Sequence, residues 1–282
     1  ISMKDYIKIG VEKGYISFDQ EMSRITYAHQ NKSRSYSNPE EKVQAETFLR
    51  LIIDYKYPEN RIKQFVSVPM GSETKEADIV VYKDDMCLIP YILVECKKQE
   101  VSEAEFQQAI GQAYSYAFAM AGEVKYVWVT SGIKSDFFEV DQTSNSRNQL
   151  PDIPQFGVSN VASYKYVYEA EYLPEEAGKQ RFFDLSVIDQ SELTRRFKQA
   201  HEALWAGGQL NPSEAFDELD KLIFCKIWDE RKPRRMGEPY DFQIITVPKE
   251  VEKSETKRRL IENDNLYKRV MALYEEGRKK DK

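Results

Sequence analysis

The sequence is poor in the residues that build disulfide frameworks and zinc sites. Its 282 residues include three cysteines and two histidines. The cysteines, Cys87, Cys96 and Cys225, form no C-x-x-C pair. A sparse, odd-numbered set of this kind is typical of a reduced, cytoplasmic protein. His29 and His201 lie far apart in the chain, and a lone histidine is more often structural than catalytic, so neither is given a role.

Other absences exclude whole classes of function. No apolar run is long enough to span a membrane, and the first residues do not have the pattern of a signal peptide. No G-x-x-x-x-G-K-[S/T] segment is present, which excludes a P-loop motor within this sequence. The tetrapeptides N-P-P-Y and D-P-P-Y of methyl-transfer pockets are also missing. What remains is an aromatic-rich composition that predicts a folded protein long enough for two domains.

Charge is unevenly distributed along the chain. The net charge is −6, and the excess of Asp and Glu lies in residues 1–183, whereas residues 184–282 are balanced. This distribution argues against a generally basic nucleic-acid coat but allows local basic patches.

The order of the predicted elements is helix, three strands, helix, strand. A helix is expected from Pro39 to about Tyr55, because Asn38 is an N-cap, followed by a first-turn proline and two acidic residues. Strands are expected over residues 61–70, 77–82, 87–96, 125–130 and 137–140, and a second helix over 103–121. Residues 125–130 are apolar on both faces, which predicts a central strand. This order predicts an α/β layer with mixed strand directions.

The regions around this layer are expected to differ in character. Residues 1–38 and 141–160 are predicted to be irregular, and residues 164–172 to form another strand. Helices are expected over 191–205, 213–231 and 249–277. The domains are therefore predicted as 1–183 and 184–282.

Two apolar strands carry charges that are costly to bury. Asp78 lies within Ala77–Tyr82, and Glu95 and Lys97 flank Cys96 at the end of the following strand. Because strand side chains alternate, Glu95 and Lys97 point to one side and Cys96 to the other. Charges in an apolar strand are unfavourable unless they are paired or bind a metal. We therefore expect Asp78 and Glu95 to meet as a divalent-metal site with Lys97 beside it, a group suited to phosphodiester hydrolysis.

Further site residues are expected on the backbone and on the two helices. The Cys96 carbonyl is a candidate third ligand for Mg²⁺, for which Mn²⁺ is a substitute, and Glu46 is a candidate fourth if the first helix packs beside the site. Lys97 is expected to position or help deprotonate the attacking water and to offset charge on the phosphorane. Gln112 and Tyr116 are four residues apart, share a helix face and are expected to support the site or the DNA.

Residues 39–140 resemble the PD-(D/E)xK nuclease superfamily, and within it the N-terminal nuclease domain of type I restriction enzyme R subunits. The resemblance rests on residues 39–46, Ala77–Val80, Val94–Lys97 and Gln112–Tyr116, the last of which fits the family's Q-x-x-x-Y pattern. The first strand motif begins Ala-Asp rather than Pro-Asp, which this subgroup tolerates. The resemblance implies a restriction-endonuclease-like mixed sheet flanked by helices. It also implies Mg²⁺-dependent cleavage of double-stranded DNA with a 5′-phosphate product.

A second resemblance covers residues 197–245. His201–Trp205, Asp217–Leu222, Lys226–Glu230 and Pro239–Phe242 are similar to the helical segment ahead of N6-adenine DNA methyltransferase domains. Enzymes that fuse a nuclease, a helical connector and a methyltransferase show this order. The resemblance implies a C-terminal helical connector domain whose partners are methyltransferase or specificity domains or subunits.

Three functions are compatible with these residues. The leading interpretation is a Mg²⁺-dependent endonuclease module of a restriction-modification enzyme. A catalytically silent nuclease-like fold would serve DNA binding or subunit assembly, and the acidic balance of residues 1–183 favours it, because a DNA-cleaving surface usually has positive rims. A repair or recombination nuclease acting on ends or branches would use the same residues.

Overall fold

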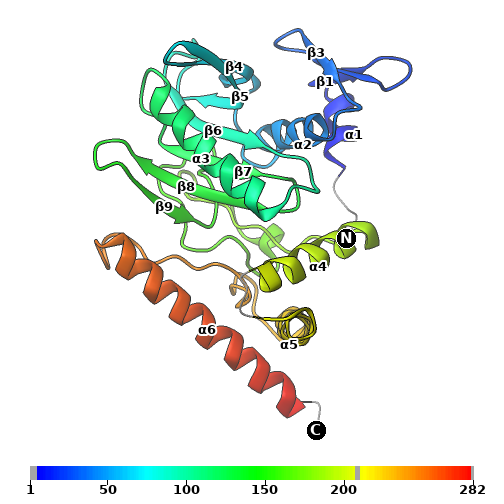
Figure 1. The fold of residues 1–282 in the computed structure, drawn as a ribbon, viewed down its shortest axis with the longest axis vertical. Coiled ribbons are helices and arrows are strands. Elements are labelled where there is room, and N and C mark those ends of the chain that lie inside the picture. The colour runs from blue at the N-terminus through cyan, green and yellow to red at the C-terminus, as the bar shows by residue number, and fades with distance from the viewer. Residues whose placement is uncertain (1–4, 207–209, 281–282) are drawn as a thin grey trace. The chain divides into compact units, whose positions relative to one another are not determined.

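The computed structural model describes residues 5–206 and 210–280, which form two compact units that divide between residues 159 and 160 (Figure 1). Each unit has its own helices, and the sheets lie in the first. Within the described residues, no helix is both long and apolar enough to cross a membrane.

The division between the units differs from the predicted domain boundary after residue 183. Residues 160–183 belong to the C-terminal unit because they pair with residues beyond 183: Val167 bridges Pro239, and the Thr246 N–H donates to the Ser163 carbonyl (2.8 Å). Pairings of this kind join residues far apart in the chain, and local sequence patterns do not reveal them.

The first unit begins with a short helix and a three-stranded antiparallel meander, where irregular structure was predicted. Helix α1 covers Tyr6–Glu12, and strands β1, β2 and β3 cover Ile16–Phe18, Arg24–Tyr27 and Lys32–Ser35. The prediction was wrong because strands this short show no clear periodicity. Burial of Ile25 and Tyr27 fixes them instead.

Helix α2 covers Pro39–Ile53 and starts where the sequence predicts. The Asn38 side chain accepts a hydrogen bond from the Glu40 N–H (3.0 Å). Pro39 occupies the first turn, where an N–H would have no helical partner. The helix packs against strands β5 and β6 of the main sheet.

A six-stranded mixed sheet forms the centre of the first unit and confirms the predicted α/β fold. Its order is β4-β5-β6-β7-β8-β9, with the strands Ile62–Met70, Glu73–Tyr82, Pro90–Cys96, Tyr126–Thr130, Ser135–Asp141 and Ser146–Leu150. A short 3-10 turn, η1 (Glu59–Arg61), precedes β4. Neighbouring strands are antiparallel except β6 and β7, which are parallel. All of β7 is buried, as predicted for a central strand.

The parallel pair requires a crossover, and helix α3 (Glu103–Ala119) supplies it. A capping box starts this helix: the Glu105 N–H donates to Ser102 Oγ (3.3 Å), and the Ser102 N–H donates to Glu105 Oε2 (3.0 Å). Figure 1 shows α3 lying across β6 and β7. Its apolar face packs on the sheet, in a core that includes Phe106, Ala113, Val80, Leu93 and Val129.

Two further predictions were wrong. Residues 146–150 form the edge strand β9 rather than loop, because pairing with β8 holds a strand that is mostly polar. Residues 164–172 form isolated bridges and the 3-10 turn η2 (Ala170–Tyr172) rather than a strand.

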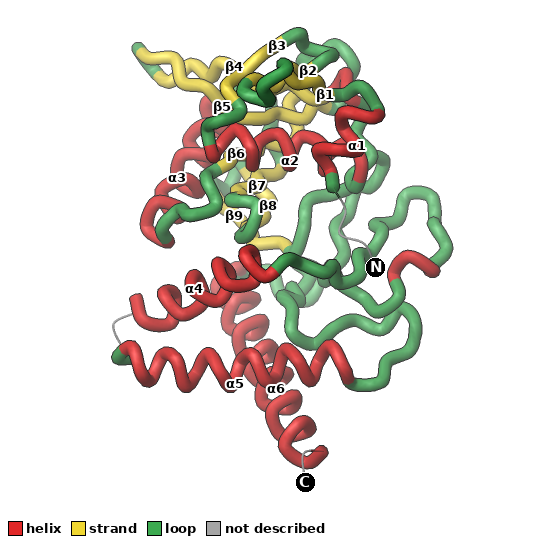
Figure 2. The backbone as a smooth tube through the Cα atoms, turned by 90° about the vertical axis from the view of Figure 1, so that its right-hand side faces the viewer, coloured by secondary structure: helices red, strands yellow, loops and turns green. Residues whose placement is uncertain are grey.

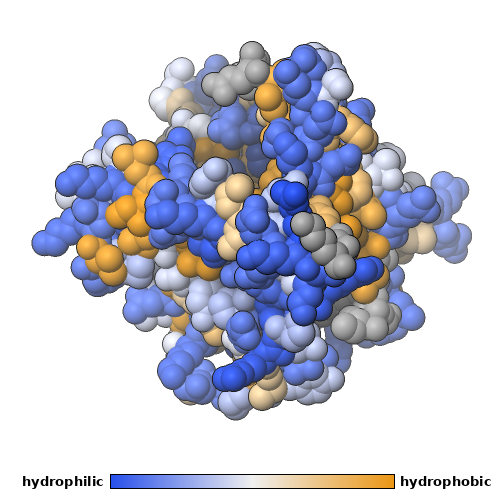
Figure 3. All heavy atoms as spheres, turned by 90° about the horizontal axis from the view of Figure 1, so that it is seen from below, coloured by the Kyte–Doolittle hydropathy of each residue, from blue (hydrophilic) through white to orange (hydrophobic). Residues whose placement is uncertain are grey.

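The second unit contains the three predicted helices, α4 (Gln190–Ala206), α5 (Pro212–Arg231) and α6 (Glu255–Lys280), seen as red tubes in Figure 2. Helix α6 begins six residues later than predicted, because the chain turns at Pro248, whose carbonyl accepts the Val251 N–H (3.0 Å). Apolar side chains reach the surface between hydrophilic ones, as the view in Figure 3 shows. Those exposed on α4 and α6 include Trp205, Leu260, Tyr267 and Met271.

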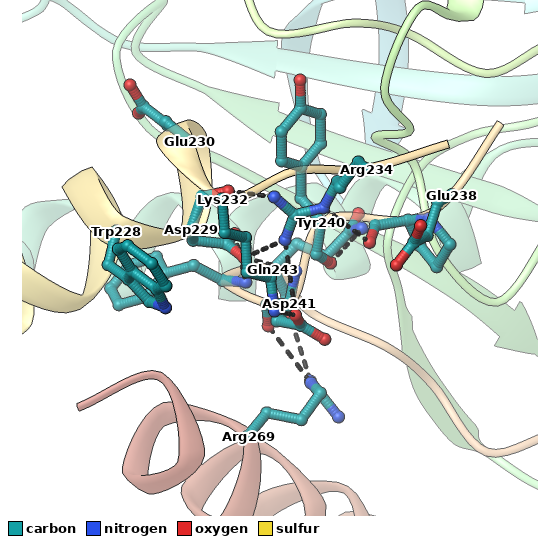
Figure 4. A network of polar contacts seen from close by, with 12 residues as sticks. Trp228, Asp229, Glu230, Lys232, Arg234, Glu238, Tyr240, Asp241, Gln243 and Arg269 are labelled. Carbon is teal, nitrogen blue, oxygen red and sulfur yellow. Dashed lines mark hydrogen bonds and ion pairs between the residues drawn. The ribbon is translucent and has the colours of Figure 1, made fainter. Parts of the chain in front are cut away.

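A buried ion pair joins the end of α5 to the segment that follows it (Figure 4). The Arg234 guanidinium donates to the carboxylate and to the backbone carbonyl of Asp229, and both side chains are 1 % exposed. Asp229 also accepts the N–H groups of Asp241 (3.2 Å) and Phe242 (2.9 Å). These contacts compensate both charges, so the pair is tolerated in the interior.

Helix α6 is tied to the same segment by Arg269. Its guanidinium donates to the backbone carbonyls of Asp241 (3.1 Å) and Gln243 (3.0 Å), and Figure 4 shows it reaching toward them from the helix. Residues 229–243 therefore form a polar centre to which both α5 and α6 are attached.

Candidate active site

Asp78 and Glu95 lie where strands β5 and β6 separate. The pairing of these strands runs from Tyr82 and Pro90 to Ile79 and Val94 and ends there. Asp78 and Glu95 are the next residue on each strand. Beyond this point β5 continues with β4 alone as a hairpin. Backbone pairing therefore brings the two carboxylates together, as predicted.

The backbone of Cys96 fixes the Asp78 carboxylate. The Cys96 N–H donates to Asp78 Oδ2 at 2.6 Å. The Cys96 side chain is buried beside Thr47 of α2, on the other side of the strand from Glu95 and Lys97, as alternation predicts. Burial, with the nearby carboxylates, raises the pKa of the Cys96 thiol well above its usual range. The thiol is therefore protonated at neutral pH and is not a nucleophile.

Glu95 forms a largely buried ion pair with Lys97. Lys97 Nζ lies 2.9 Å from Glu95 Oε1, and Glu95 is 2 % exposed. The second oxygen, Oε2, is buried and has no hydrogen-bond partner in the described part of the chain. A buried carboxylate oxygen without a partner is unfavourable. This oxygen is therefore suited to receive a cation or a proton donor.

Burial raises the pKa values of both carboxyls, and the Glu95 charge raises that of Asp78 further. The pKa of Asp78 lies well above its usual range, first because of desolvation and second because of the Glu95 charge; the Cys96 N–H and Lys97 oppose the rise. Desolvation also raises the pKa of Glu95, and Lys97 limits the effect. Burial lowers the pKa of Lys97, but the Glu95 carboxylate outweighs burial and the net shift is upward. Lys97 is thus a fixed positive charge at neutral pH.

Helix α2 turns Gln44 and Glu40 toward the site. Gln44 Nε2 donates to the backbone carbonyl of Asp78 at 3.0 Å. Glu40 lies one helical turn earlier on the same face, and its charge contributes to the raised pKa values of Asp78 and Glu95. Gln44 therefore holds the strand that carries Asp78, and Glu40 is a third carboxylate whose field reaches the pair.

Glu46, the candidate on this helix from the sequence, is not brought to the site. It lies two residues beyond Gln44, or about 200° around the helix. Its charge acts instead on Tyr6 and Tyr36, whose pKa values it helps to raise after desolvation. Glu40 and Gln44 are four residues apart and share one helix face. Glu40 could therefore have been predicted to lie near the site if Gln44 had been known to face the sheet.

Gln112 and Tyr116 form a hydrogen-bonded pair on α3. Gln112 Nε2 donates to Tyr116 Oη at 2.7 Å, and the Tyr116 ring lies in the core between α3 and the sheet. Both residues share one helix face, as predicted. Among the described residues, no hydrogen bond or ion pair links them directly to Asp78 or Glu95.

The oxygen donors at the site fit a Mg²⁺ ion that is held partly by substrate. Within residues 5–206 and 210–280, no three side chains of His, Cys, Asp or Glu are grouped to hold a metal. The side chains present are two carboxylates, one with a buried oxygen that has no partner. Mg²⁺ commonly binds one or two carboxylates and completes its shell with water and substrate phosphates.

The Cys96 carbonyl lies on the same side of β6 as the Cys96 N–H. In an antiparallel ladder, the N–H and C=O of one residue point toward the same neighbouring strand. The Cys96 N–H points to Asp78, whereas the next N–H, of Lys97, donates to Thr130 on the opposite side (2.8 Å). Extended geometry therefore turns the Cys96 carbonyl toward the gap that Asp78 borders.

The mixed sheet flanked by helices, with this charged group at a strand end, is consistent with a nuclease-like fold. Residues 39–154 match the family model of the type I restriction enzyme R protein N terminus. The match covers less than half of the chain, runs from α2 beyond β9, and includes Asp78, Glu95 and Lys97. It supports the resemblance of the first unit to a restriction-enzyme nuclease module. No match to a functionally curated protein was found.

Proposed function

We propose that the first unit is a Mg²⁺-dependent DNA endonuclease module of a restriction system. The observation that carries the proposal is the Asp78–Glu95–Lys97 group at the separation of β5 and β6, inside the segment that matches the R protein N terminus. The proposed substrate is double-stranded DNA, and the reaction is hydrolysis of a phosphodiester bond.

Asp78 and Glu95 are the proposed metal ligands, and the Cys96 carbonyl completes the protein's share. When bound, the ion supplies positive charge that polarises the phosphate and lowers the pKa of a water molecule. Positive charge between the two carboxyls also favours their ionised forms, which burial disfavours in its absence, with the Glu95 charge adding to the effect on Asp78.

Lys97 is proposed to orient the attacking water and to stabilise negative charge on the phosphorane. Its raised pKa keeps the side chain protonated at neutral pH. This protonation favours an electrostatic role over proton abstraction. The ion pair with Glu95 Oε1 fixes the ammonium beside the carboxylate, and part of the side chain remains accessible to substrate.

The helical unit is proposed to be a connector. The similarity of residues 197–245 to the segment ahead of N6-adenine methyltransferase domains lies outside the matched residues. On this proposal, methyltransferase or specificity domains or subunits read the recognition sequence, and the nuclease module cuts.

The test of the proposed function is cleavage of supercoiled plasmid in Mg²⁺ or Mn²⁺. We expect the wild-type chain to nick or linearise the plasmid, EDTA to stop it, and Asp78→Ala and Lys97→Ala each to reduce the rate by at least about a hundredfold. Cleavage that persists in both variants would assign the activity to another site. A wild-type chain that neither cuts nor binds Mn²⁺ would favour the silent fold used for DNA binding or assembly. Cleavage of linear but not closed circular DNA would favour a repair nuclease.

Gln112→Leu is expected to lower the rate of cleavage by roughly tenfold, because it removes the hydrogen bond to Tyr116 from the helix that covers the sheet beside Glu95. The matched control is Gln108→Leu, one turn earlier on the same helix at an exposed position. Steady-state cleavage rates of the two variants are compared on the same plasmid. Equal rates for the two variants would remove Gln112 from the supporting role.

A further inference from the structure

The N-terminal meander carries cations that contact strands β4 and β5, the second of which bears Asp78. Lys32 and Arg34 lie two residues apart on β3, so their side chains emerge on the same side of the strand. Strand β3 is an edge of its sheet. The meander lies before residue 39, outside the segment that matches the restriction-enzyme family.

Arg34 is held next to the strand that bears Asp78. Its guanidinium carbon lies 3.8 Å from the centre of the Phe65 ring, and Nη2 lies 3.8 Å from Glu76 Oε2. Glu76 and Asp78 are two residues apart on β5, which is about 7 Å along an extended strand. The residue that Arg34 contacts on β5 is therefore about 7 Å along the strand from Asp78.

Lys32 and Lys63 extend the positive charge along the edge strand β4. Lys32 Nζ donates to the Gln64 carbonyl at 2.8 Å. Burial lowers the pKa of Lys32, and repulsion from Arg34 and Lys63 lowers it further. Lys32 therefore lies close to two other cations, and clustered positive charge favours the binding of a polyanion.

We propose that Arg34, with Lys32 and Lys63, binds the phosphate backbone of DNA and holds it across the β5 side of the site. This inference rests on the proposed function, since it identifies the surface on which the substrate lies. Stacking on Phe65 pre-organises the planar guanidinium, and its side chain is 40 % exposed. Glu76 is 56 % exposed and its ion pair is weak, so a phosphate can replace it.

The meander does not need Arg34 for its attachment to the rest of the unit. Tyr27 Oη donates to Glu41 Oε1 of α2 at 2.5 Å in a buried contact. Gln30 Oε1 accepts the Gln64 N–H of β4 at 2.9 Å. A variant of Arg34 is therefore expected to keep its fold, and a change in DNA binding can be separated from a change in structure.

The experiment is a titration of the full chain with a labelled DNA duplex in EDTA at several salt concentrations. We expect Arg34→Gln to weaken binding by roughly tenfold and to lower the slope of log K against log salt by about one, with a similar change for Lys63→Gln. In Mg²⁺, Arg34→Gln should raise KM for plasmid cleavage and leave kcat unchanged. The control is Lys268→Gln, an exposed ion-paired lysine on α6, which should leave binding unchanged.

The outcomes separate this inference from the proposed function. If Arg34→Gln and Lys63→Gln bind DNA like the wild type while Asp78→Ala abolishes cleavage, the inference is wrong and the nuclease proposal stands. If the wild type neither binds nor cuts DNA, both fail. If Arg34→Gln also lowers the melting temperature, Lys63→Gln decides: weakened binding with a normal melting temperature supports the phosphate-binding surface, and unchanged binding with a normal melting temperature refutes it.

Discussion

An Asp78→Asn variant is expected to lose DNA cleavage by about a thousandfold or more and yet to be more stable than the wild type at neutral pH. The loss follows from removal of one of the two carboxylates proposed to hold the metal. The gain follows because the Asp78 carboxyl is desolvated and repelled by Glu95. Asparagine retains an oxygen that can accept the Cys96 N–H, now 2.6 Å away. We expect a gain on the order of 1–2 kcal/mol in the free energy of unfolding.

The sign of the effect depends on pH. Below about pH 3, Asp78 and Glu95 are largely protonated in both the folded and the unfolded chain, so they do not destabilise the fold. As pH rises, the unfolded chain releases these protons first because the folded pKa values are raised, so folding stability falls until the folded carboxyls have also ionised. The stability gain of Asp78→Asn should therefore be small near pH 4 and large near neutrality.

Thermal unfolding over this pH range, with EDTA or with Mn²⁺, tests both the gain in stability and the loss of metal binding. Mn²⁺ should raise the melting temperature of the wild type and not that of Asp78→Asn. Asp136→Asn is the matched control, because desolvation also raises the pKa of this half-buried carboxyl on β8, but the control should keep both cleavage and the response to Mn²⁺. A loss of stability in Asp78→Asn at neutral pH, or an unchanged response to Mn²⁺, would contradict the proposed site.

Arg234→Met is expected to destabilise the helical unit by roughly 3–5 kcal/mol. The substitution preserves much of the side-chain volume but leaves Asp229 buried at 1 % exposure without its counter-charge. The two N–H groups that Asp229 also accepts, from Asp241 and Phe242, only partly compensate an isolated carboxylate. Urea titration, followed by the helical circular dichroism signal at about 222 nm, measures the change in the free energy of unfolding.

The neighbour of Arg234 in the chain provides the control. Arg235 is exposed, and Arg235→Met is expected to change stability by less than about 0.5 kcal/mol. Adding Asp229→Asn to Arg234→Met should recover part of the loss, because it removes the uncompensated charge. An Arg234→Met variant as stable as Arg235→Met would mean that water reaches the pair and replaces the guanidinium.

Features fixed by local chemistry were predictable from the sequence. The start of α2 at Asn38 and Pro39, the buried strand β7 and the alternation of Glu95, Cys96 and Lys97 all depend on residues adjacent in the chain. Each is confirmed, because caps, periodicity and strand alternation act over a few residues.

Features fixed by distant contacts were not predictable. Whether Glu40 or Glu46 faces the site depends on how α2 is rotated against the sheet, which Gln44 sets through the Asp78 carbonyl. The meander strands and β9 likewise depend on burial and pairing rather than on their own composition. The sequence indicated that a glutamate of α2 could lie near Asp78 and Glu95, and tertiary packing determines that it is Glu40 rather than Glu46.

The placement of Cys96 has a consequence for how the Glu-x-Lys motif varies in evolution. The backbone N–H of this residue holds the Asp78 carboxylate, whereas its side chain packs beside Thr47 of α2. Because any residue other than proline has a backbone N–H, the contact with Asp78 does not restrict the side chain at position 96. Burial restricts that side chain to small apolar groups. Among related chains, substitutions at position 96 should accompany compensating changes in size at position 47 and, on the proposed function, neither should follow changes in the DNA substrate.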